Sequence, residues 1–235
     1  MGREMINAIR DSLIFYRELG FQYIPGDRDI GSCKVHTDPS RTPFIKEKIN
    51  DPDAELDSLR KEIGDCHRCK LSSNRTHIVF GEGSSRAEIM FIGEAPGREE
   101  DIQARPFVGD AGKLLTSLIE KMGLRRDEVY IGNIVKCRPP YNRDPEEDEI
   151  DTCRQFIERQ IDIIKPRVII SLGRISAQSL LNTRIPISKL RGRFWEYKGI
   201  ALMPTFHPAY LLRNPKDKWL TWQDAMMVLE RLGRK

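Results

Sequence analysis

The sequence predicts an α/β fold in which a central parallel four-stranded sheet carries helices on both faces. Two observations lead to this prediction. From residue 54 onward, short apolar runs alternate with longer amphipathic stretches, a pattern typical of parallel sheets. Polar residues also follow three of the apolar runs, and open sheets of this kind bind ligands outside the carboxyl ends of their strands.

The N-terminal part of the chain reads differently from the rest. Residues 3–24 place apolar side chains near helical spacing, which predicts an amphipathic helix. Residues 25–53 are rich in proline, glycine and aspartate and are predicted to be a linker. We therefore predict an N-terminal helical extension over residues 1–53 and a single domain over residues 54–235.

The elements of that domain follow from the periodicity. The apolar runs predict strands at about residues 87–92, 129–135, 167–172 and 200–205. The amphipathic stretches predict helices near residues 54–64, 109–122, 146–164, 174–182 and 217–232.

Composition limits the class of protein. The 39% hydrophobic content can fill a core, and no long apolar run or signal peptide is recognisable, so we expect a cytoplasmic protein without membrane contact. The net charge is +4, but residues 186–235 alone carry ten basic and four acidic side chains. This basic segment favours a polyanionic partner, although a solvated surface would give the same pattern.

Three strand ends carry candidate functional groups: Glu94 within "GEAPG", Asn133 within "YIGN" and His207 within "FHPAY". Their strands are expected to end at the same edge of the sheet, where the side chains could form one site. Two nucleotide-binding motifs are excluded, because "GDAGKLL" lacks the spacing of a phosphate-binding loop and "GEAPGR" lacks that of a dinucleotide fingerprint.

The chain has five cysteines, and their odd number in a chain without a secretory signal argues against a disulfide framework. Cys66 and Cys69 have the spacing of a metal-ligand knuckle, and Cys137 and Cys153 are its expected partners because Cys33 falls in the predicted linker. Four thiolates suit either zinc or an iron–sulfur cluster. The 15 residues between Cys137 and Cys153 make a zinc ribbon less favourable, and buried thiols without a ligand are the remaining alternative. His67 and His77 are interpreted as bystanders.

Several motifs follow one another along the chain: "CHRCKL", "VFGEG", "GEAPGREED", "RPFVGDAGKLL", "YIGNIVKCRPPYNR", "RGRFWEY" and "FHPAYLLRNP". Over residues 62–232 the sequence resembles the family 4 uracil-DNA glycosylases, the iron–sulfur branch of that superfamily. The resemblance implies a three-layer α/β/α sandwich and a structural [4Fe–4S] cluster on Cys66, Cys69, Cys137 and Cys153, with zinc as the alternative. It also implies a DNA repair enzyme that excises uracil from single- or double-stranded DNA and leaves an abasic site.

The resemblance also implies roles for residues of the site. Phe107 would stack on the extruded base, and the Asn133 amide would read the edge of uracil. His207 would donate to the oxygen at position 2 of the departing base, and Glu94 would orient water and offset charge on the sugar. Glu100 is expected to crowd the 5-methyl group of thymine. The backbone groups expected against the base belong to one turn: Gly93, Glu94, Ala95 and Pro96.

The DNA contacts are expected from the C-terminal segment. Leu211, Leu212 and Arg213 resemble a wedge that enters the minor groove and fills the vacated space. The expected phosphate contacts are Lys189, Arg191 and Arg193.

The leading interpretation is a monofunctional glycosylase that acts as a monomer, because the motifs contain no lysine placed for Schiff-base chemistry. The alternative is a non-catalytic or covalent uracil-DNA or damage-binding module of the same fold. The covalent module is disfavoured because residues 186–194 contain no histidine that could form the bond to DNA. The non-catalytic module is disfavoured because all three polar residues of the strand ends are present. The sequence assigns no protein partner, a sliding clamp included.

Overall fold

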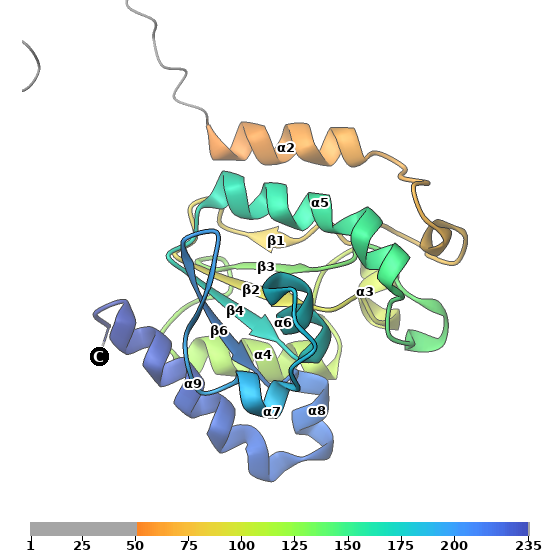
Figure 1. The fold of residues 1–235 in the computed structure, drawn as a ribbon. Coiled ribbons are helices and arrows are strands. Elements are labelled where there is room, and N and C mark those ends of the chain that lie inside the picture. Colours follow the sequence, from red (N-terminus) through yellow and green to blue (C-terminus); the bar gives the residue numbers. More distant parts are fainter. Residues whose placement is uncertain (1–50, 235) are drawn as a thin grey trace, which may run out of the picture. The chain divides into compact units, whose positions relative to one another are not determined.

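One mixed sheet of six strands forms the centre of the computed structural model, which describes residues 51–234 (Figure 1). The strand order is β1-β3-β2-β4-β6-β5. The four inner strands are parallel and match the four that the sequence predicts. Their bounds are Ile89–Gly93 for β2, Tyr130–Asn133 for β3, Val168–Leu172 for β4 and Ile200–Thr205 for β6.

The two edge strands correct the predicted four-stranded sheet. β1 (Glu82–Gly83) pairs antiparallel with β3, and β5 (Trp195–Tyr197) pairs antiparallel with β6. Both strands are short, and an edge strand pairs with the sheet on one side only. Neither sequence therefore contains the apolar run that predicts a buried strand. The prediction of a parallel sheet therefore holds for the centre and not for the edges.

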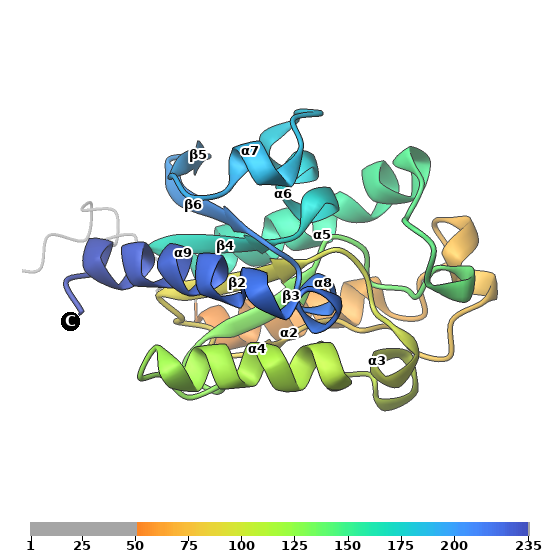
Figure 2. The same cartoon turned by 90° about the horizontal axis from the view of Figure 1, so that it is seen from below.

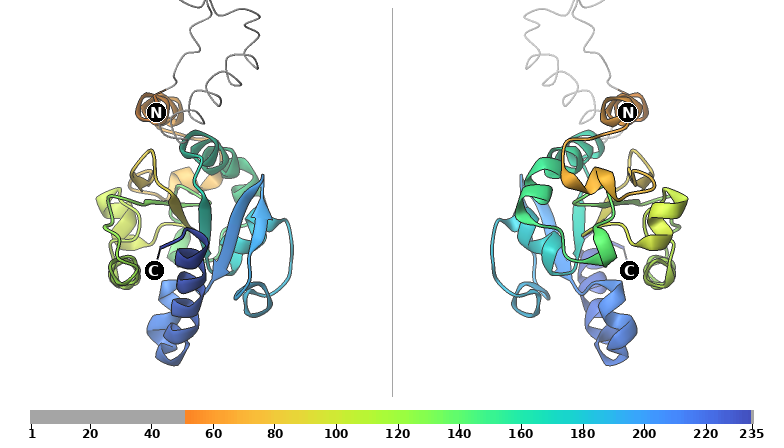
Figure 3. Two further views of the ribbon diagram at one scale, coloured as in Figure 1. Left: turned by 90° about the vertical axis from the view of Figure 1, so that its left-hand side faces the viewer. Right: turned by 90° about the vertical axis from the view of Figure 1, so that its right-hand side faces the viewer.

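Helices cover both faces of this sheet (Figures 2 and 3). The long helices agree with the predicted ranges to within two or three residues: α2 (Pro52–Ile63), α4 (Asp110–Lys121), α5 (Glu147–Ile164), α6 (Arg174–Leu181) and α9 (Lys218–Arg231). The sequence did not predict several short elements: α3 (Arg98–Gln103), α7 (Ile187–Leu190), α8 (Pro208–Arg213) and the 3₁₀ turns η1 (Lys70–Ser73), η2 (Pro140–Asn142) and η3 (Pro215–Asp217).

The alternation of side chains along β2 divides the core into two layers. Ile89 and Phe91 face α4 and α9, whereas Met90 and Ile92 face α5 and α6. All four side chains are 2% exposed or less. Successive side chains of a strand point to opposite faces, so the fully apolar run of β2 requires a helical layer on each side. The predicted three-layer α/β/α architecture is confirmed.

α2 extends the layer formed by α5 and runs alongside it in Figure 1. Asp51 caps its N-terminus by accepting a hydrogen bond from the Asp53 N–H at 3.4 Å. The helix predicted over residues 3–24, most of the predicted linker and Cys33 lie outside the described residues, so the domain boundary stays a prediction. Within residues 51–234, no helix has both the length and the apolar character needed to cross a membrane.

Candidate active site

A cavity of about 360 Å³ opens at the carboxyl ends of β2 and β3. Gly93 and Asn133 are partners in the sheet register there, and the turn after β6 brings His207 to the same cavity. The predicted convergence of three strand ends is therefore present. The lining residues are Glu94, Ala95, Pro96, Gly97, Glu100, Phe107, Ala111, Asn133, Pro139, Asn142, Arg143, His207, Ala209 and Arg213.

The floor of the cavity depends on the missing side chain of Gly93. A Cβ atom at this position would lie 2.4 Å from Asn133 Oδ1 and 2.5 Å from the Phe107 ring carbon Cζ. Either distance is far below van der Waals contact, so any larger residue would displace the amide or the ring. Gly93 thereby allows an aromatic ring and an amide from separate elements to meet at the end of β2.

Asn133 is 1% exposed, and its Oδ1 atom has no hydrogen-bond donor among residues 51–234. An unpaired buried acceptor costs about 1–3 kcal/mol, so natural folds usually avoid one. The backbone oxygen of Asn133 accepts a hydrogen bond from Lys136 Nζ at 3.0 Å, and Lys136 Nζ also donates to Gln160 Oε1 at 2.7 Å. The end of β3 is thus held by Lys136, while the amide oxygen of a residue that lines the cavity has no donor among the described residues.

Phe107 is 6% exposed and has a left-handed backbone with φ of 51°. The adjacent turn is held by Glu100, whose Oε1 accepts from the Val108 and Gly109 N–H groups at 2.9 and 3.0 Å. Glu100 Oε2 accepts from the Gly97 N–H at 3.1 Å. This carboxylate therefore connects the "GEAPG" turn to the turn carrying Phe107. Its predicted role against the thymine methyl group stays a prediction.

His207 lies beside Phe107, with ring centroids 5.7 Å apart. Its Nδ1 atom accepts a hydrogen bond from the Ala209 N–H at 3.2 Å at the start of α8. Burial lowers the pKa of His207 to about 4; the Glu100 carboxylate opposes this shift and the Arg213 guanidinium adds to it. The imidazole is therefore neutral at pH 7, and because Nδ1 is the acceptor, the proton is on Nε2.

Glu94 follows β2 directly and lines the same cavity. Burial raises the pKa of Glu94 to about 7, the Asp144 carboxylate adds to the shift, and the Arg174 guanidinium opposes it. A carboxyl group with this pKa exists in both protonation states near neutral pH. The site thus combines a group able to accept a proton from water with a neutral histidine that can only donate through Nε2.

Comparison with known proteins agrees with this geometry. Residues 80–226 match the model of the uracil DNA glycosylase superfamily. The type-4 uracil-DNA glycosylase of Saccharolobus solfataricus is 51% identical over 189 residues, which cover 77% of this chain and 88% of that protein. The type-4 enzyme of Sulfurisphaera tokodaii is 48% identical over 184 residues, or 74% of this chain and 84% of that protein. The chain belongs to the uracil-DNA glycosylase superfamily.

A third relative supports the same membership. The type-4 uracil-DNA glycosylase of Archaeoglobus fulgidus is 42% identical over 188 residues, which cover 77% of this chain and 94% of that protein. The aligned lengths are close to the length of the domain that the structure describes. The resemblance found in the sequence motifs is therefore confirmed at the level of the superfamily.

The four cysteines that the superfamily resemblance singles out line one small cavity between α5 and the segment after α2: Cys66, Cys69, Cys137 and Cys153. All four are free thiols. Within residues 51–234, no three or more Cys, His, Asp or Glu side chains are arranged around one point as a single metal ion requires.

The sulfur atoms of this cavity are near hydrogen-bond donors. The Lys136 backbone N–H lies 3.3 Å from Cys153 Sγ, and Arg68 Nη1 lies 3.2 Å from Cys66 Sγ. Arg75 Nη1 lies 3.5 Å from Cys137 Sγ. Donors of this kind stabilise sulfur atoms that carry negative charge, whereas burial raises the pKa of Cys137 and Cys153; the surroundings therefore suit thiolates that are held by a ligand. His67 and His77 contact Asp65 and Asp101 instead.

The structure corrects two of the predicted DNA contacts. Leu211 is 4% exposed and packs inside the protein, so it cannot be a wedge; only Leu212 is exposed, at 44%. Arg191 forms a two-pronged ion pair with Asp224 at 2.6 and 3.0 Å and also donates to the Leu220 carbonyl, and only 13% of its side chain is exposed, so most of the guanidinium is already engaged inside the protein. The remaining predicted contacts are exposed: Lys189, Arg193 and Arg213.

Sequence reasoning missed part of the cavity wall. Pro139, Asn142 and Arg143 line it from the loop after Cys137, and Ala111 and Ala209 line it from α4 and α8. The "RPPYNR" motif was the available signal for the loop, because two prolines directly after a strand and a cysteine mark a rigid connection. The two alanines carried no signal, since small residues at helix starts are ordinary.

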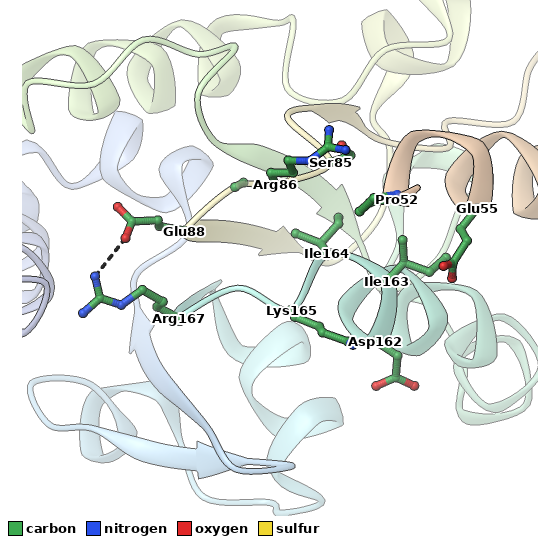
Figure 4. Close-up of a pocket in the computed structure, with 11 residues that line it drawn as sticks. Pro52, Glu55, Ser85, Arg86, Glu88, Asp162, Ile163, Ile164, Lys165 and Arg167 are labelled. Atoms are coloured by element: carbon green, nitrogen blue, oxygen red, sulfur yellow. Dashed lines mark hydrogen bonds and ion pairs between the residues drawn. The ribbon is translucent and has the colours of Figure 1, made fainter. Parts of the chain in front are cut away.

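A second pocket lies at the amino ends of β2 and β4 (Figure 4). Most of its charged side chains are paired: Glu88 contacts Arg167 at 2.8 Å and Arg234 at 2.7 Å, and Arg86 contacts Asp51 and Asp53 at 3.0 Å, whereas Glu55 and Lys165 have no ion pair among the described residues. This pocket has the same volume as the candidate site, about 360 Å³. None of the residues singled out from the superfamily motifs contributes to it.

Proposed function

We propose that the chain excises uracil from DNA in the cavity formed by Phe107, Asn133, His207 and Glu94. Uracil excision in DNA repair is the activity of its type-4 relatives, and this chain is a monofunctional glycosylase of the same superfamily. The observation that carries the assignment of the cavity is the unpaired Asn133 Oδ1 beside the Phe107 and His207 rings.

A base inside a duplex cannot reach such a cavity, so the nucleotide must rotate out of the helix. Unstacking costs a few kcal/mol and is least for a mispaired base. Stacking of the extruded ring on Phe107 contributes about 1–3 kcal/mol and does not depend on which base is bound. Phe107 therefore supplies binding energy, and discrimination must come from a polar group.

Asn133 is the group that discriminates. Uracil presents a carbonyl at position 4 beside an N–H at position 3, which complement the donor and acceptor of one amide. Cytosine presents the reverse pattern and would leave buried polar groups unpaired on both sides. Binding of uracil gives Asn133 Oδ1 the donor that residues 51–234 do not supply.

His207 acts on the departing base. Cleavage of the glycosidic bond leaves negative charge partly on the oxygen at position 2, and a fixed donor stabilises that charge most when it needs no rearrangement. The Nε2–H group of neutral His207 is such a donor, because the hydrogen bond from Ala209 to Nδ1 fixes the tautomer and the ring. Because His207 is neutral, the cavity does not have to hold a charged imidazolium before uracil binds.

Glu94 acts on the sugar side. In its ionised form the carboxylate orients a water molecule toward the anomeric carbon and offsets positive charge on the oxocarbenium-like sugar. The proton of that water ends on Glu94 or in solvent, and the uracil anion leaves. The pKa of about 7 makes the carboxylate a better base than an ordinary glutamate.

We also propose that Cys66, Cys69, Cys137 and Cys153 hold a [4Fe–4S] cluster. Four cysteine thiolates are the ligand set of such a cluster, and these four cysteines line one cavity. Its role here is structural: it would tie the segment after α2 to the loop that begins at Cys137 and continues into the cavity wall. A brown colour and four irons per chain in protein purified without oxygen support this, whereas a colourless zinc protein overturns it.

DNA is bound through exposed residues of the C-terminal segment. Leu212 is the wedge, and the phosphate contacts are Lys189, Arg193 and Arg213. Binding of this kind weakens as salt rises, because each neutralised phosphate releases counterions.

Incubation with a uracil-containing oligonucleotide, followed by alkaline cleavage of abasic sites, tests the function. We expect strand cleavage only after alkali and only at uracil. Protein with an intact cysteine site that binds the oligonucleotide without releasing uracil would instead indicate a binding module.

A further inference from the structure

Tyr141 is the most exposed large hydrophobic residue of the described chain, with 99% of its surface accessible. It lies in η2 and has a left-handed backbone with φ of 55° and ψ of 20°. A non-glycine residue in this region costs about 1 kcal/mol or more. Neither the exposure of a whole aromatic ring nor this backbone conformation stabilises the isolated protein.

The loop around Tyr141 is nevertheless firmly held. The Asn142 and Arg143 N–H groups donate to the carbonyl oxygens of Pro139 and Pro140, both at 3.1 Å. Arg138 Nε donates to Asn142 Oδ1 at 2.7 Å. The ring of Tyr141 is therefore presented to solvent by a rigid turn.

An internal ion pair anchors the same loop to α5. Arg143 donates to both carboxylate oxygens of Glu149 at 2.7 and 2.8 Å, and the Glu149 side chain is fully buried. A fixed loop loses little conformational entropy when it contacts a ligand. The rigidity of the loop makes Tyr141 suitable for binding a partner in one defined orientation.

The position of the loop identifies that partner. Pro139, Asn142 and Arg143 line one side of the uracil cavity, whereas Ala209 and Arg213 line it from α8. Tyr141 lies in the first of these segments, and Leu212 lies in the second. Two exposed apolar side chains therefore belong to the two segments that border one cavity mouth.

We propose that Tyr141 stacks on the nucleobase next to the extruded uracil. This proposal rests on the proposed function of the cavity. Extrusion of one base removes a stacking neighbour from the base beside it, and an aromatic ring can replace that neighbour without regard to sequence. Tyr141 and Leu212 thus hold the opened strand from two sides, and Tyr141 is a DNA-positioning residue that does not touch the reacting atoms.

The test compares the wild-type protein with Tyr141→Ala, Tyr141→Phe and Tyr141→Trp. The substrates are single-stranded and duplex oligonucleotides with uracil beside 2-aminopurine, whose fluorescence reports stacking. For Tyr141→Ala we expect the half-saturating DNA concentration to rise about five- to hundredfold in both substrates, with loss of the fluorescence change. Tyr141→Phe and Tyr141→Trp should retain both signals, and the rate at saturation should stay within about threefold of wild type.

Two controls separate this role from a structural one. Trp219→Ala removes another exposed aromatic side chain, 63% accessible on α9 and outside the cavity wall, and should leave DNA binding unchanged. Inhibition by free uracil reports the cavity itself and should be the same in Tyr141→Ala as in wild type. A thermal midpoint of Tyr141→Ala equal to that of wild type excludes unfolding as the cause.

Equal DNA affinity and equal 2-aminopurine signals in wild type and Tyr141→Ala would overturn the proposal, even if both proteins excise uracil. An inactive wild-type protein would overturn the proposed function. DNA binding and the 2-aminopurine signal can be measured with a protein that does not excise uracil. They therefore decide the role of Tyr141 even if the wild-type protein is inactive.

Discussion

The pockets at the two ends of the parallel strands have equal volume but opposite chemistry. At the amino ends of β2 and β4, Glu88 is ion-paired with Arg167 (Figure 4) and also with Arg234. At the carboxyl ends of β2 and β3, Asn133 Oδ1 has no donor among the described residues and Glu94 has a strongly raised pKa.

This difference shows that the size of a pocket does not identify a site in this molecule. A pocket whose polar groups are already paired gains nothing from a ligand, because binding would exchange one set of contacts for another. A pocket with an unpaired buried acceptor gains the contact that folding left unmade. If that contrast controls activity, substitutions at the unpaired acceptor should have larger effects than substitutions at the paired charges.

The largest effect is expected for Asn133→Leu, which keeps the approximate shape of the side chain and removes its polar atoms. Uracil would then bury an N–H and a carbonyl without partners, so single-turnover excision should fall by at least about a thousandfold. The thermal midpoint should stay equal or rise, because the variant removes the cost of the unpaired oxygen.

This combination of lost activity and retained stability is specific to a binding group. A variant that loses activity and also unfolds more readily would indicate that Asn133 mainly supports the fold, and the contrast between the two pockets would lose its basis.

The next effect concerns His207→Asn, which removes the donor to the departing base. Loss of one such donor typically lowers kcat by about 10²–10³. Since burial holds the pKa of His207 at about 4, the pH dependence of the rate near neutral pH should be the same in wild type and in His207→Asn. His77→Asn provides the control, because His77 contacts Asp101 away from the cavity.

A slope near pH 6.5 that disappears in His207→Asn would show that the charged form of His207 takes part. The donor would then be an imidazolium, and the neutral mechanism derived from the Ala209 hydrogen bond would be wrong.

A smaller effect is expected from pH through Glu94. The ionised form is the active one and its pKa is about 7, so kcat/KM should rise about tenfold per unit up to pH 7 and then level off. Asp144→Asn removes a cause of the raised pKa and should move this limb to lower pH. Pre-steady-state rates between pH 5 and 9 measure both.

The same group makes a stability prediction. The folded-state pKa of Glu94 lies above its unfolded value, so the folded protein loses stability as pH rises from about 4.5 to 7. Glu94→Gln should therefore be more stable than wild type above pH 7 and equal to it at pH 4. A variant that is less stable at pH 8 would contradict the buried position of the carboxyl group.

The parts of the fold that the sequence predicts are those stabilised by their own periodicity. The runs that become β2 and β4 are buried at every position and apolar except at Ser171, and α4 and α5 alternate apolar and polar residues over three turns or more. β1 has two residues and β5 has three, so their conformation is decided by pairing with β3 and β6. No local pattern encodes a strand that forms only against its neighbour.

The same limit applies to the site. Glu94, Asn133 and His207 were found because each follows a strand, which is a local property. Leu211 and Arg191 were assigned to DNA wrongly because residue type does not reveal burial: Leu211 faces the interior, and the partner of Arg191 is Asp224 on α9. Contacts between residues far apart in the chain exist only in the folded protein.

The smallest effect is expected for Arg167→Ala, at the pocket whose charges are paired. Both partners are partly accessible, 57% for the Arg167 side chain and 39% for Glu88, and exposed ion pairs contribute about 0–1 kcal/mol. Stability in urea should thus fall by no more than about 1 kcal/mol, and less at high salt, since Glu88 keeps its contact with Arg234. Uracil excision should be unchanged, because the variant lies at the opposite ends of the strands from Asn133 and Glu94. A loss of excision without loss of stability would mean that this edge takes part in function, and the contrast would then have to rest on something other than unpaired polar groups.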